Sequence, residues 1–249
     1  SRRQRQMCIR DRVYDHHKEN MAALQAEHPG VHEAESEEAA ADAVEALVLA
    51  VKPHAVLPLI SALSEGDREL PLLISIAAAV TLDEMEERAC DGTRIVRAMP
   101  NTPCMVLSGV IAYSPGTAVT DEDEEAARRL LSGCGSVFKV EESRMNAVSA
   151  ISGCGPAYMF TALDALSDAG VAMGLPRKTA LELAAGTMLG SALMLEQTGE
   201  HPMALRDAVT SPGGTTIAAL NALDECGFRN AWIQAVKSAV RRAEEMEGN

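Results

Sequence analysis

The sequence predicts an α/β domain followed by an all-α domain. From Arg12 to about Val140, short β-rich stretches alternate with amphipathic helical stretches, which is typical of a parallel sheet with crossover helices. After Met145 this alternation stops, and long segments rich in Ala, Leu and Met recur with helical spacing. Hydrophobic residues make up 47% of the chain, an ordinary globular share that supplies one large core or two smaller ones. We therefore expect an α/β domain over residues 13–144 and a helical domain over residues 145–249.

Five stretches of the first domain have the composition of strands. The clearest is 46–51, where apolar residues follow one another without a break, as in a strand buried on both faces. The others are predicted at 72–77, 94–99, 109–114 and 136–140. Helices are predicted at 53–63, 82–89 and 121–131. Thr81 with Glu84 three residues later has the pattern of a capping box, which fixes the start of the second of these helices.

The helical domain is predicted to contain about five helices, separated by Gly/Pro turns. These turns are Gly153-Cys-Gly-Pro156, Gly174-Leu-Pro176, Gly199-Glu-His-Pro202 and Pro212-Gly-Gly214. Apolar residues run almost all around the segments 158–166 and 181–195, so there is more apolar surface than about five helices bury against one another. A homodimer or a higher homo-oligomer would cover this surface. A compact bundle with wide core faces is the alternative.

Charge and cysteine usage exclude several classes of partner. The chain has 22 Lys+Arg and 36 Asp+Glu, a formal net charge of −14, which disfavours nucleic acid and anionic membrane surfaces. The longest apolar run, 70–80, contains a proline and is shorter than the roughly 18 residues of a spanning helix. Six cysteines occur without a CxxC pair, so neither a metal site nor a disulfide scaffold is predicted. We expect a cytoplasmic protein.

The first twelve residues, SRRQRQMCIRDR, differ in character from the rest of the chain. They are strongly basic in an acidic protein, and they have neither the apolar core of a signal peptide nor a helical apolar stripe. We expect residues 1–12 to be a foreign or disordered leader; one explanation is translation of sequence joined to an incomplete reading frame, but the sequence leaves their origin open.

Three consecutive predicted strands end in rigid or small-residue loops. The first ends at Lys52-Pro53, the second at Ala77-Ala78-Ala79, and the third at Met99-Pro-Asn-Thr-Pro103. Nucleotides bind beyond the carboxyl ends of strands in doubly wound sheets, and small residues let a flat ring approach the backbone. These loops favour a Rossmann-like nucleotide site. The alternative at Pro53 is that it merely occupies the first turn of a helix.

The first unit expected of a Rossmann-like domain is missing. No GxGxxG turn occurs, so the usual pyrophosphate site at a helix N-terminus is not supplied. Val13-Tyr14-Asp15 has the pattern of the second strand, where an acidic residue accepts hydrogen bonds from a ribose diol and points to NAD. His16, His17 and Lys18 come next and can offset the repulsion of a 2′-phosphate. The alternative is that all these residues are solvated ones at a helix start.

The most informative motif is Val209-Thr-Ser-Pro-Gly-Gly-Thr-Thr-Ile217, a loop that enters a predicted helix over 218–223. Pro-Gly-Gly leaves main-chain N–H groups open at a helix N-terminus, where unpaired donors and the helix dipole favour an anion such as a carboxylate. Ser211, Thr215 and Thr216 add hydroxyls there. A plain N-cap containing glycine is the alternative, but two glycines and three hydroxyls exceed what capping needs.

Six ordered motifs closely resemble those of pyrroline-5-carboxylate reductases. They are Leu49-Ala-Val-Lys-Pro-His54, Ser75-Ile-Ala-Ala78, Arg97-Ala-Met-Pro-Asn-Thr-Pro103, Ser152-Gly-Cys-Gly-Pro-Ala-Tyr158, Gly170-Val-Ala-Met-Gly-Leu-Pro-Arg177 and Ser211-Pro-Gly-Gly-Thr-Thr-Ile217. The resemblance runs from about Val13 to Glu245. It implies a dinucleotide-binding domain, a helical dimerisation domain, and reduction of 1-pyrroline-5-carboxylate to L-proline with NADPH or NADH, the last step of proline biosynthesis.

The resemblance also implies roles for individual residues. The cofactor would be lined by Ala50, Val51, Lys52, Pro53, Ala77, Ala78 and Asn101, with Asp15 and Glu37 at its adenosine half. The substrate carboxylate would be held by Ser211, Gly213, Gly214 and Thr215, with Glu142, Glu200 and Asp207 near the same pocket. Thr216 would hydrogen-bond the ring nitrogen and is the residue expected to serve catalysis.

The sequence departs from the family pattern in four places. The glycine-rich unit is missing, Ala79 stands where glycine is usual, Cys154 replaces a small serine, and Glu37 lies where an amide commonly meets the adenosine. Asp15 and Glu37 together leave the choice between NADPH and NADH open.

Two other functions also stay open. One is a two-domain dehydrogenase of the β-hydroxyacid type, which needs a catalytic lysine for which Lys178 is poorly placed, and the other is an inactive, truncated dimerisation fragment.

Overall fold

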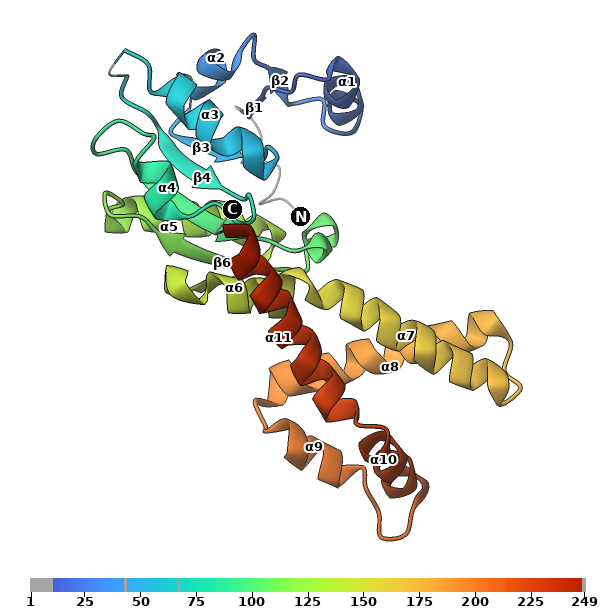
Figure 1. Cartoon of the computed structure of the whole chain (residues 1–249). Coiled ribbons are helices and arrows are strands. Elements are labelled where there is room, and N and C mark those ends of the chain that lie inside the picture. Colours follow the sequence, from blue (N-terminus) through green and yellow to red (C-terminus); the bar gives the residue numbers. More distant parts are fainter. Residues whose placement is uncertain (1–10, 43, 67, 248–249) are drawn as a thin grey trace. The chain divides into compact units, whose positions relative to one another are not determined.

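The chain folds into two compact units (Figure 1). A computed structural model describes residues 11–42, 44–66 and 68–247. The first unit takes in residues up to 153 together with the end of the last helix from 242, and the second takes in residues 154–241. The leader predicted at 1–12 lies outside the described residues except for its last two. Of these, Arg12 pairs with His32 as part of a short strand.

A five-stranded sheet forms the centre of the first unit. Its strands are β3 (Ala46–Leu49), β4 (Leu72–Ser75), β5 (Ile95–Met99), β6 (Gly109–Pro115) and β7 (Gly135–Lys139), in the spatial order β3-β4-β5-β6-β7. Strands β3, β4 and β5 are parallel, with Leu49 opposite Ser75 and Ile74 opposite Val96. All five predicted strands are present, and the first two end two residues earlier than predicted.

The expectation of a parallel sheet is correct for β3, β4 and β5 but not for the pairing of β6 with β5. This strand runs antiparallel to β5, with Arg97 opposite Ser114, and β7 then pairs in parallel with β6. The reason lies in the connection, which contains only the 3₁₀ turn η2 (Thr102–Val106). A parallel return needs a crossover of a dozen or more residues, whereas a short connection reverses the chain.

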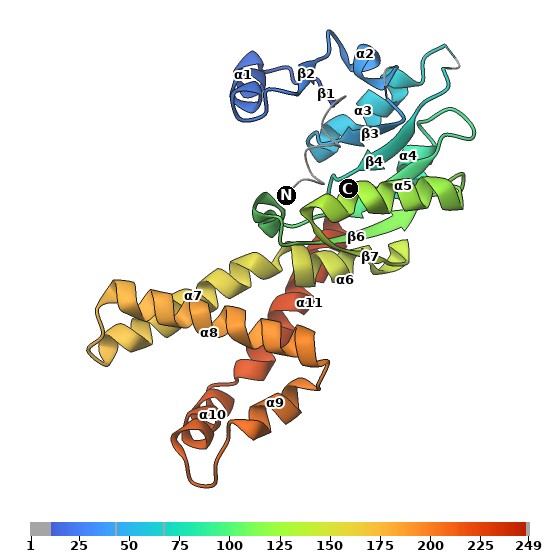
Figure 2. The same cartoon turned by 180° about the vertical axis from the view of Figure 1, so that it is seen from behind.

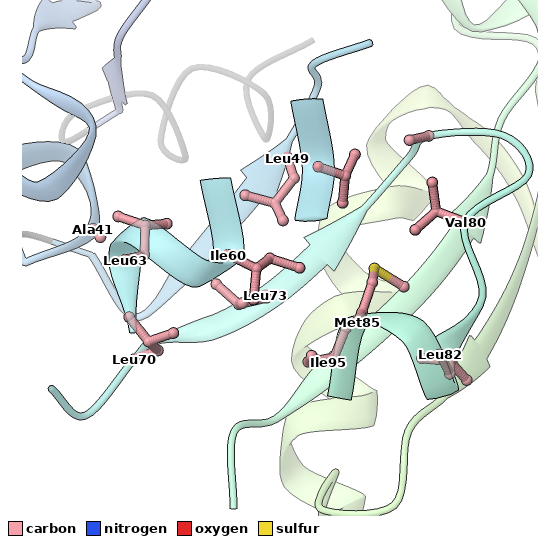
Figure 3. Packing of buried hydrophobic residues seen from close by; sticks show 12 residues of the cluster. Ala41, Leu49, Ile60, Leu63, Leu70, Leu73, Val80, Leu82, Met85 and Ile95 are labelled. Carbon is pink, nitrogen blue, oxygen red and sulfur yellow. The ribbon is translucent and has the colours of Figure 1, made fainter. Parts of the chain in front are cut away.

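Helices cover both faces of this sheet (Figures 1 and 2). On one face, α3 (Pro53–Leu63) and α4 (Leu82–Glu86) pack on β3 and β4; Figure 3 shows Ile60, Leu73 and Met85 among the buried side chains of this cluster. On the other face, Ala127 of α5 (Asp121–Leu131) packs with Ile111 and Tyr113 of β6. Helices α3 and α5 have the predicted bounds, whereas α4 is three residues shorter.

The predicted capping box of α4 is confirmed. The Glu84 main-chain N–H donates to the Thr81 hydroxyl (3.2 Å), and the Thr81 N–H donates to the Glu84 carboxylate (2.8 Å). Thr120 and Asp123 form the same arrangement at the start of α5. Each box provides acceptors for two main-chain N–H groups that have no partner within the helix. The boxes therefore fix the residues at which α4 and α5 begin.

The N-terminal part of the first unit carries a second, two-stranded sheet. Strand β1 (Arg12–Val13) pairs in parallel with β2 (His32–Glu33), and helix α1 (Lys18–Glu27) connects them. Helix α2 (Glu37–Ala41) leads from β2 to β3. The predicted strand over 13–15 is therefore placed about one residue too late.

Short turns lead into the second unit, which is all helical. They are η4 (Glu142–Arg144), α6 (Met145–Val148) and the π turn η5 (Ser149–Gly153), after η3 (Ser132–Cys134) earlier in the chain. The helices are α7 (Gly155–Ala172), α8 (Arg177–Thr198), α9 (Pro202–Ala208), α10 (Thr215–Glu225) and α11 (Phe228–Glu247). Gly170 of α7 lies so close to Ala180 of α8 that a Cβ on it would come within 2.9 Å of the Ala180 methyl.

The second unit leaves much apolar surface uncovered. Phe160 is 65% exposed, Leu189 is 63% exposed, and several other large side chains of α7 and α8 share this property. Buried residues of these two helices are mostly small, such as Ala180 and Ala184. One copy of the chain therefore does not bury its helical apolar faces, as the sequence predicted. Among the described residues, no helix is both long and apolar enough to cross a bilayer.

Ala79, between β4 and α4, holds a left-handed backbone with φ +57°. A Cβ makes this region unfavourable by about 1–2 kcal/mol, of which glycine's larger unfolded-state entropy offsets part. We expect Ala79→Gly to raise the free energy of unfolding by about 0.5–1 kcal/mol, measured by urea denaturation. Ala126→Gly in α5 is the matched control, which we expect to lower it by about 1 kcal/mol. Destabilisation by both variants would contradict the strain.

Candidate functional site

The loops at the ends of β1, β3 and β4 open into one hollow of about 2570 Å³. Its walls include all but one of the residues that the sequence assigns to the cofactor. These residues are Asp15, Glu37, Ala50, Val51, Lys52, Pro53, Ala77 and Ala78. They come together because parallel strands place their carboxyl ends along one edge of a sheet. The roles of these residues stay predictions, but the structure brings them to one place.

Small residues line the part of the hollow beyond β4. Ala77 is buried and its N–H lies 3.5 Å from the Ser75 hydroxyl, while Ala78 is exposed. Ala50, which comes directly after β3, is exposed as well. The small side chains at these three positions let a flat ring approach the backbone.

Lys52 and Pro53 lie where β3 gives way to α3. Lys52 is the N-cap residue of α3 without a side-chain bond to the helix, and Pro53 is its first residue. Proline at this position is favoured because its missing N–H is not needed there. The alternative that Pro53 occupies the first turn of a helix is thus correct. Pro53 also lines the hollow, so the two interpretations are compatible.

Asp15 is already engaged by its own chain. Its carboxylate accepts a hydrogen bond from the His17 main-chain N–H (2.7 Å) and from the Asn20 amide (2.9 Å). These bonds, the one from His17 first, hold the pKa of Asp15 below its usual value, so the group is an anion at neutral pH. Glu37 lies 3.0 Å from the His16 ring. The two acidic groups therefore line the same hollow, and each contacts one of the two neighbouring histidines.

Asn101 does not line the hollow, unlike the other residues assigned to the cofactor. Its amide donates to the Ser152 carbonyl (3.0 Å), and its side-chain oxygen accepts from the Val110 N–H (2.9 Å). Both ends of the side chain are thus used to fasten the loop after β5 to β6 and to η5. In this structure Asn101 therefore fixes the position of the loop that follows β5.

The glycine loop has the geometry of an anion site. Gly213 adopts φ +68°, and the Gly214 N–H closes a turn on the Ser211 carbonyl at 3.0 Å. A Cβ on Gly214 would lie 2.3 Å from the Ser211 hydroxyl oxygen, so a larger residue there would displace the serine side chain. Helix α10 begins at Thr215, three residues before the predicted start.

The first turn of α10 presents main-chain donors. No side chain caps this helix at Gly214, and between described residues no hydrogen bond is made by the N–H of Thr215 or Thr216. These donors and the positive end of the helix dipole favour a carboxylate. The structure therefore brings together Ser211, Gly213, Gly214, Thr215 and Thr216 as the sequence predicted, and their roles stay predictions.

Glu200 lies just before the short helix α9, and Asp207 lies in its last turn, in the same unit as the glycine loop. Glu200 is exposed, and the neighbouring His201 accepts a hydrogen bond from the Met203 N–H (3.2 Å), so the histidine caps α9. Asp207 is paired with Arg206 at 2.7 Å and is exposed. This arrangement leaves both carboxylates at the surface.

Glu142 belongs to the first unit and has partners that sequence reasoning missed. Its Oε1 atom accepts from the Leu82 N–H at the start of α4 (2.7 Å) and from the Arg97 guanidinium of β5 (2.9 Å). Arg97 is 4% exposed. The only sequence sign of this ion pair was an arginine inside an otherwise apolar strand, a position that requires a partner.

Within the described ranges, no group of three or more His, Cys, Asp or Glu side chains is arranged to hold a metal ion. The cysteines described there are all free thiols.

Known proteins with the same motifs were found by sequence and by structure. A family profile described as "Pyrroline-5-carboxylate reductase dimerisation" matches residues 142–246. The pyrroline-5-carboxylate reductase of Synechocystis sp. is 44% identical over 207 residues, which cover 83% of this chain and 77% of that protein. The chain belongs to the pyrroline-5-carboxylate reductase family.

Solved structures of this family have the same fold. The pyrroline-5-carboxylate reductase of Coxiella burnetii superposes with a TM-score of 0.88 at 34% identity, over 94% of this chain and 87% of that one. The Plasmodium falciparum enzyme, solved with NADP bound, superposes with a TM-score of 0.83 at 30% identity, over 95% and 87% of the two chains. The predicted fold class, a Rossmann-like dinucleotide-binding domain followed by a helical dimerisation domain, is confirmed, and so is the expected homo-oligomer.

Variants of Glu142 distinguish a structural role of its carboxylate from a role in binding the substrate. We expect Glu142→Gln to lower the free energy of unfolding by about 1–2 kcal/mol, because the carboxylate beside buried Arg97 is lost. Glu142→Ala should cost about 3 kcal/mol, since it also removes the acceptor of the Leu82 N–H. Both values come from urea denaturation.

Glu125→Gln provides the control for these variants. Glu125 pairs with Arg128 at the surface, so we expect a loss of at most about 0.5 kcal/mol. Unchanged stability of Glu142→Gln together with a raised KM for the substrate would instead assign Glu142 to the substrate pocket.

Proposed function

We propose that this chain catalyses the NAD(P)H-dependent reduction of 1-pyrroline-5-carboxylate to L-proline, the last step of proline biosynthesis. Its place of action in this proposal is the cytoplasm, and its form is a homodimer or a higher homo-oligomer. Residues 13–144 serve as the dinucleotide-binding domain and 145–249 as the substrate-binding and dimerisation domain. The observation that carries the proposal is the glycine loop at the start of α10, whose open main-chain donors suit the carboxylate of this substrate.

The hollow at the strand ends fits a nicotinamide dinucleotide. Ala50 and Ala78 leave its floor open to a flat ring, and a volume of about 2570 Å³ exceeds what such a molecule occupies. In this proposal Ala50–Pro53 and Ala77–Ala78 hold the nicotinamide half, while Asp15 and Glu37 face the adenosine ribose. When bound, the reduced cofactor supplies a hydride.

The residues of the glycine loop orient the substrate. The N–H groups at the start of α10 and the Ser211 hydroxyl hold the carboxylate, and the helix dipole adds to this attraction. The Thr216 hydroxyl oxygen accepts a hydrogen bond from the protonated ring nitrogen. Positive charge on that nitrogen disappears as the C=N bond is reduced, so no strong acid or base is needed. Catalysis is then mainly a matter of holding two flat rings in contact.

A dehydrogenase of the β-hydroxyacid type is disfavoured by the position of Lys178. This lysine is the second residue of α8, its side chain is 88% exposed, and it lies 3.9 Å from Glu182 one turn on. A general acid or base has to reach the reacting atoms from a fixed position. An exposed side chain in the first turn of a helix does not provide that position.

The hydroxyl of Thr216 supplies the first test. We expect Thr216→Ala to lower kcat/KM for 1-pyrroline-5-carboxylate about 10²-fold, because a hydrogen bond to the reacting nitrogen is lost, while the melting temperature stays that of the unmodified protein. Thr187→Ala, an exposed position of α8, is the control and should leave the melting temperature unchanged too. Wild-type turnover in Thr216→Ala would remove Thr216 from its role. Absence of activity in the unmodified chain would favour the inactive dimerisation fragment.

The exposed helical faces supply the second test. Phe160 is 65% exposed in one copy, and we expect Phe160→Asp to shift the protein from oligomer to monomer in sedimentation velocity, since a buried unpaired charge costs several kcal/mol. Phe138→Asp is the control, because Phe138 is 54% exposed on β7 in the other unit. If both variants sediment as the unmodified protein does, α7 does not contribute to the interface.

A further inference from the structure

Two cysteines from separate segments of the first unit come together at the start of β6. Cys104 lies in η2, which follows β5, and Cys134 is the last residue of η3, which precedes β7. The turns η2 and η3 are in contact, although β6 and α5 lie between them in the chain. The fold therefore brings together two thiols that the sequence keeps far apart.

Two glycines make this approach possible. The Cys104 sulfur lies over Gly109, the first residue of β6, so closely that a Cβ on this glycine would overlap it. Gly109 is paired with Gly135 of β7, and a Cβ on Gly135 would overlap the Gly109 carbonyl oxygen. Cys134 directly precedes Gly135. Because neither glycine has a side chain, the main chain beside Cys134 reaches the residue on which the Cys104 sulfur rests.

Electrostatics agree with this geometry. Partial burial, and after it the neighbouring Cys104 thiol, raise the pKa of Cys134 above its usual value. Repulsion between two thiolates is felt in this way only when the sulfurs are near each other. Cys134 is exposed and Cys104 is half-buried, so a small reagent from solvent reaches Cys134 first.

The other described cysteines have different surroundings. The Cys90 thiol donates to the Ser64 carbonyl at 3.1 Å. Cys154 and Cys226 are exposed and belong to the second unit. Cys226 therefore serves as a comparison thiol that is accessible and lies outside the unit that holds Cys104 and Cys134.

A bond at Cys104 would restrain η2. The Cys104 main-chain N–H donates to the Asn101 carbonyl (3.0 Å), and the Asn101 side chain already fastens the start of this loop. Further along η2, Met105 is 89% exposed and Leu107 ends the turn in a left-handed conformation with φ +57°. Joining Cys104 to η3 would therefore fasten the loop at a second point, next to its exposed part.

We propose that Cys104 and Cys134 form a reversible dithiol–disulfide site that reacts with small disulfides such as oxidised glutathione. The Cys134 thiol loses its proton and attacks one glutathione sulfur, which forms a mixed disulfide and releases one glutathione that takes up a proton. The Cys104 thiol then loses its proton and attacks the Cys134 sulfur, which forms the Cys104–Cys134 bond and releases the second glutathione.

The electrons balance in this exchange. Two cysteine thiols are oxidised to one disulfide, and one glutathione disulfide is reduced to two thiols. Disulfides of intracellular proteins are usually transient or redox-sensing, and a bond that glutathione makes and breaks has this property. The inference goes beyond the proposed reaction and does not depend on it.

Mapping the cross-link in the full chain tests the site. The protein is incubated with oxidised glutathione, its remaining thiols are alkylated, and trypsin cuts after Arg129, between the two cysteines. We expect mass spectrometry to find the peptides of Cys104 and Cys134 joined, and dithiothreitol to separate them. The cross-link should form at least about tenfold faster in the folded chain than in urea, because the fold raises the effective concentration of one thiol at the other.

Three variants assign the two steps. Cys104→Ser should stop the reaction at the mixed disulfide and leave glutathione on Cys134. Cys134→Ser, at an exposed position, should abolish the cross-link, whereas Cys226→Ser is the matched control and should leave it unchanged.

Several results would overturn the proposal. They are glutathione on both cysteines without a bond between them, a cross-link that joins Cys134 of two copies, and equal rates of cross-linking in the folded and the urea-unfolded chain. The comparison of rates uses the unmodified chain, so a folding defect in Cys104→Ser does not remove the test. Reductase activity is not a readout, so these outcomes are separate from those of Thr216→Ala.

Discussion

The main-chain hydrogen bonds that join β3, β4 and β5 are the interaction on which the rest of the site depends. Their parallel register, with Leu49 opposite Ser75, places the carboxyl ends of these strands at one edge of the sheet. The loops after these strands, 50–53 and 77–78, therefore meet at one hollow, although more than twenty residues separate them. A shift of this register by one residue would turn the side chains of a strand to the opposite face and so remove apolar residues from the two clusters that cover the sheet.

Some polar groups near the site are used in hydrogen bonds within the fold, whereas others are left free to bind a ligand. The carboxylate of Asp15, the amide of Asn101 and the carboxylate of Glu142 are each bonded to main-chain groups of this chain. The N–H groups at the start of α10 have no such bonds among the described residues. An anion is attracted to donors that the fold leaves open, which is why the glycine loop carries more of the functional argument than any single carboxylate.

Uncovered apolar surface has two different sources in this chain. On α7 and α8 it lies on helix faces, and the family's dimerisation region coincides with it, so a second copy accounts for it. At β3 it lies on the edge of the sheet, where the described residues place no strand beyond β3. Helix faces need only shape and apolar contact, whereas a strand edge also demands a partner with matching N–H and C=O groups. The two surfaces therefore call for different occupants.

The sequence by itself determined the elements, the family and the glycine loop, because these depend on local periodicity, capping and motif. The helices over 53–63 and 121–131 and the Thr81–Glu84 box were predictable since their hydrogen bonds join residues a few positions apart. Only the tertiary structure decided the antiparallel β6, the pairing of Glu142 with buried Arg97, the use of Asn101 as a fastening and the hollow beside β3. These features join residues far apart in the chain, and local pattern carries no information on which distant groups will meet.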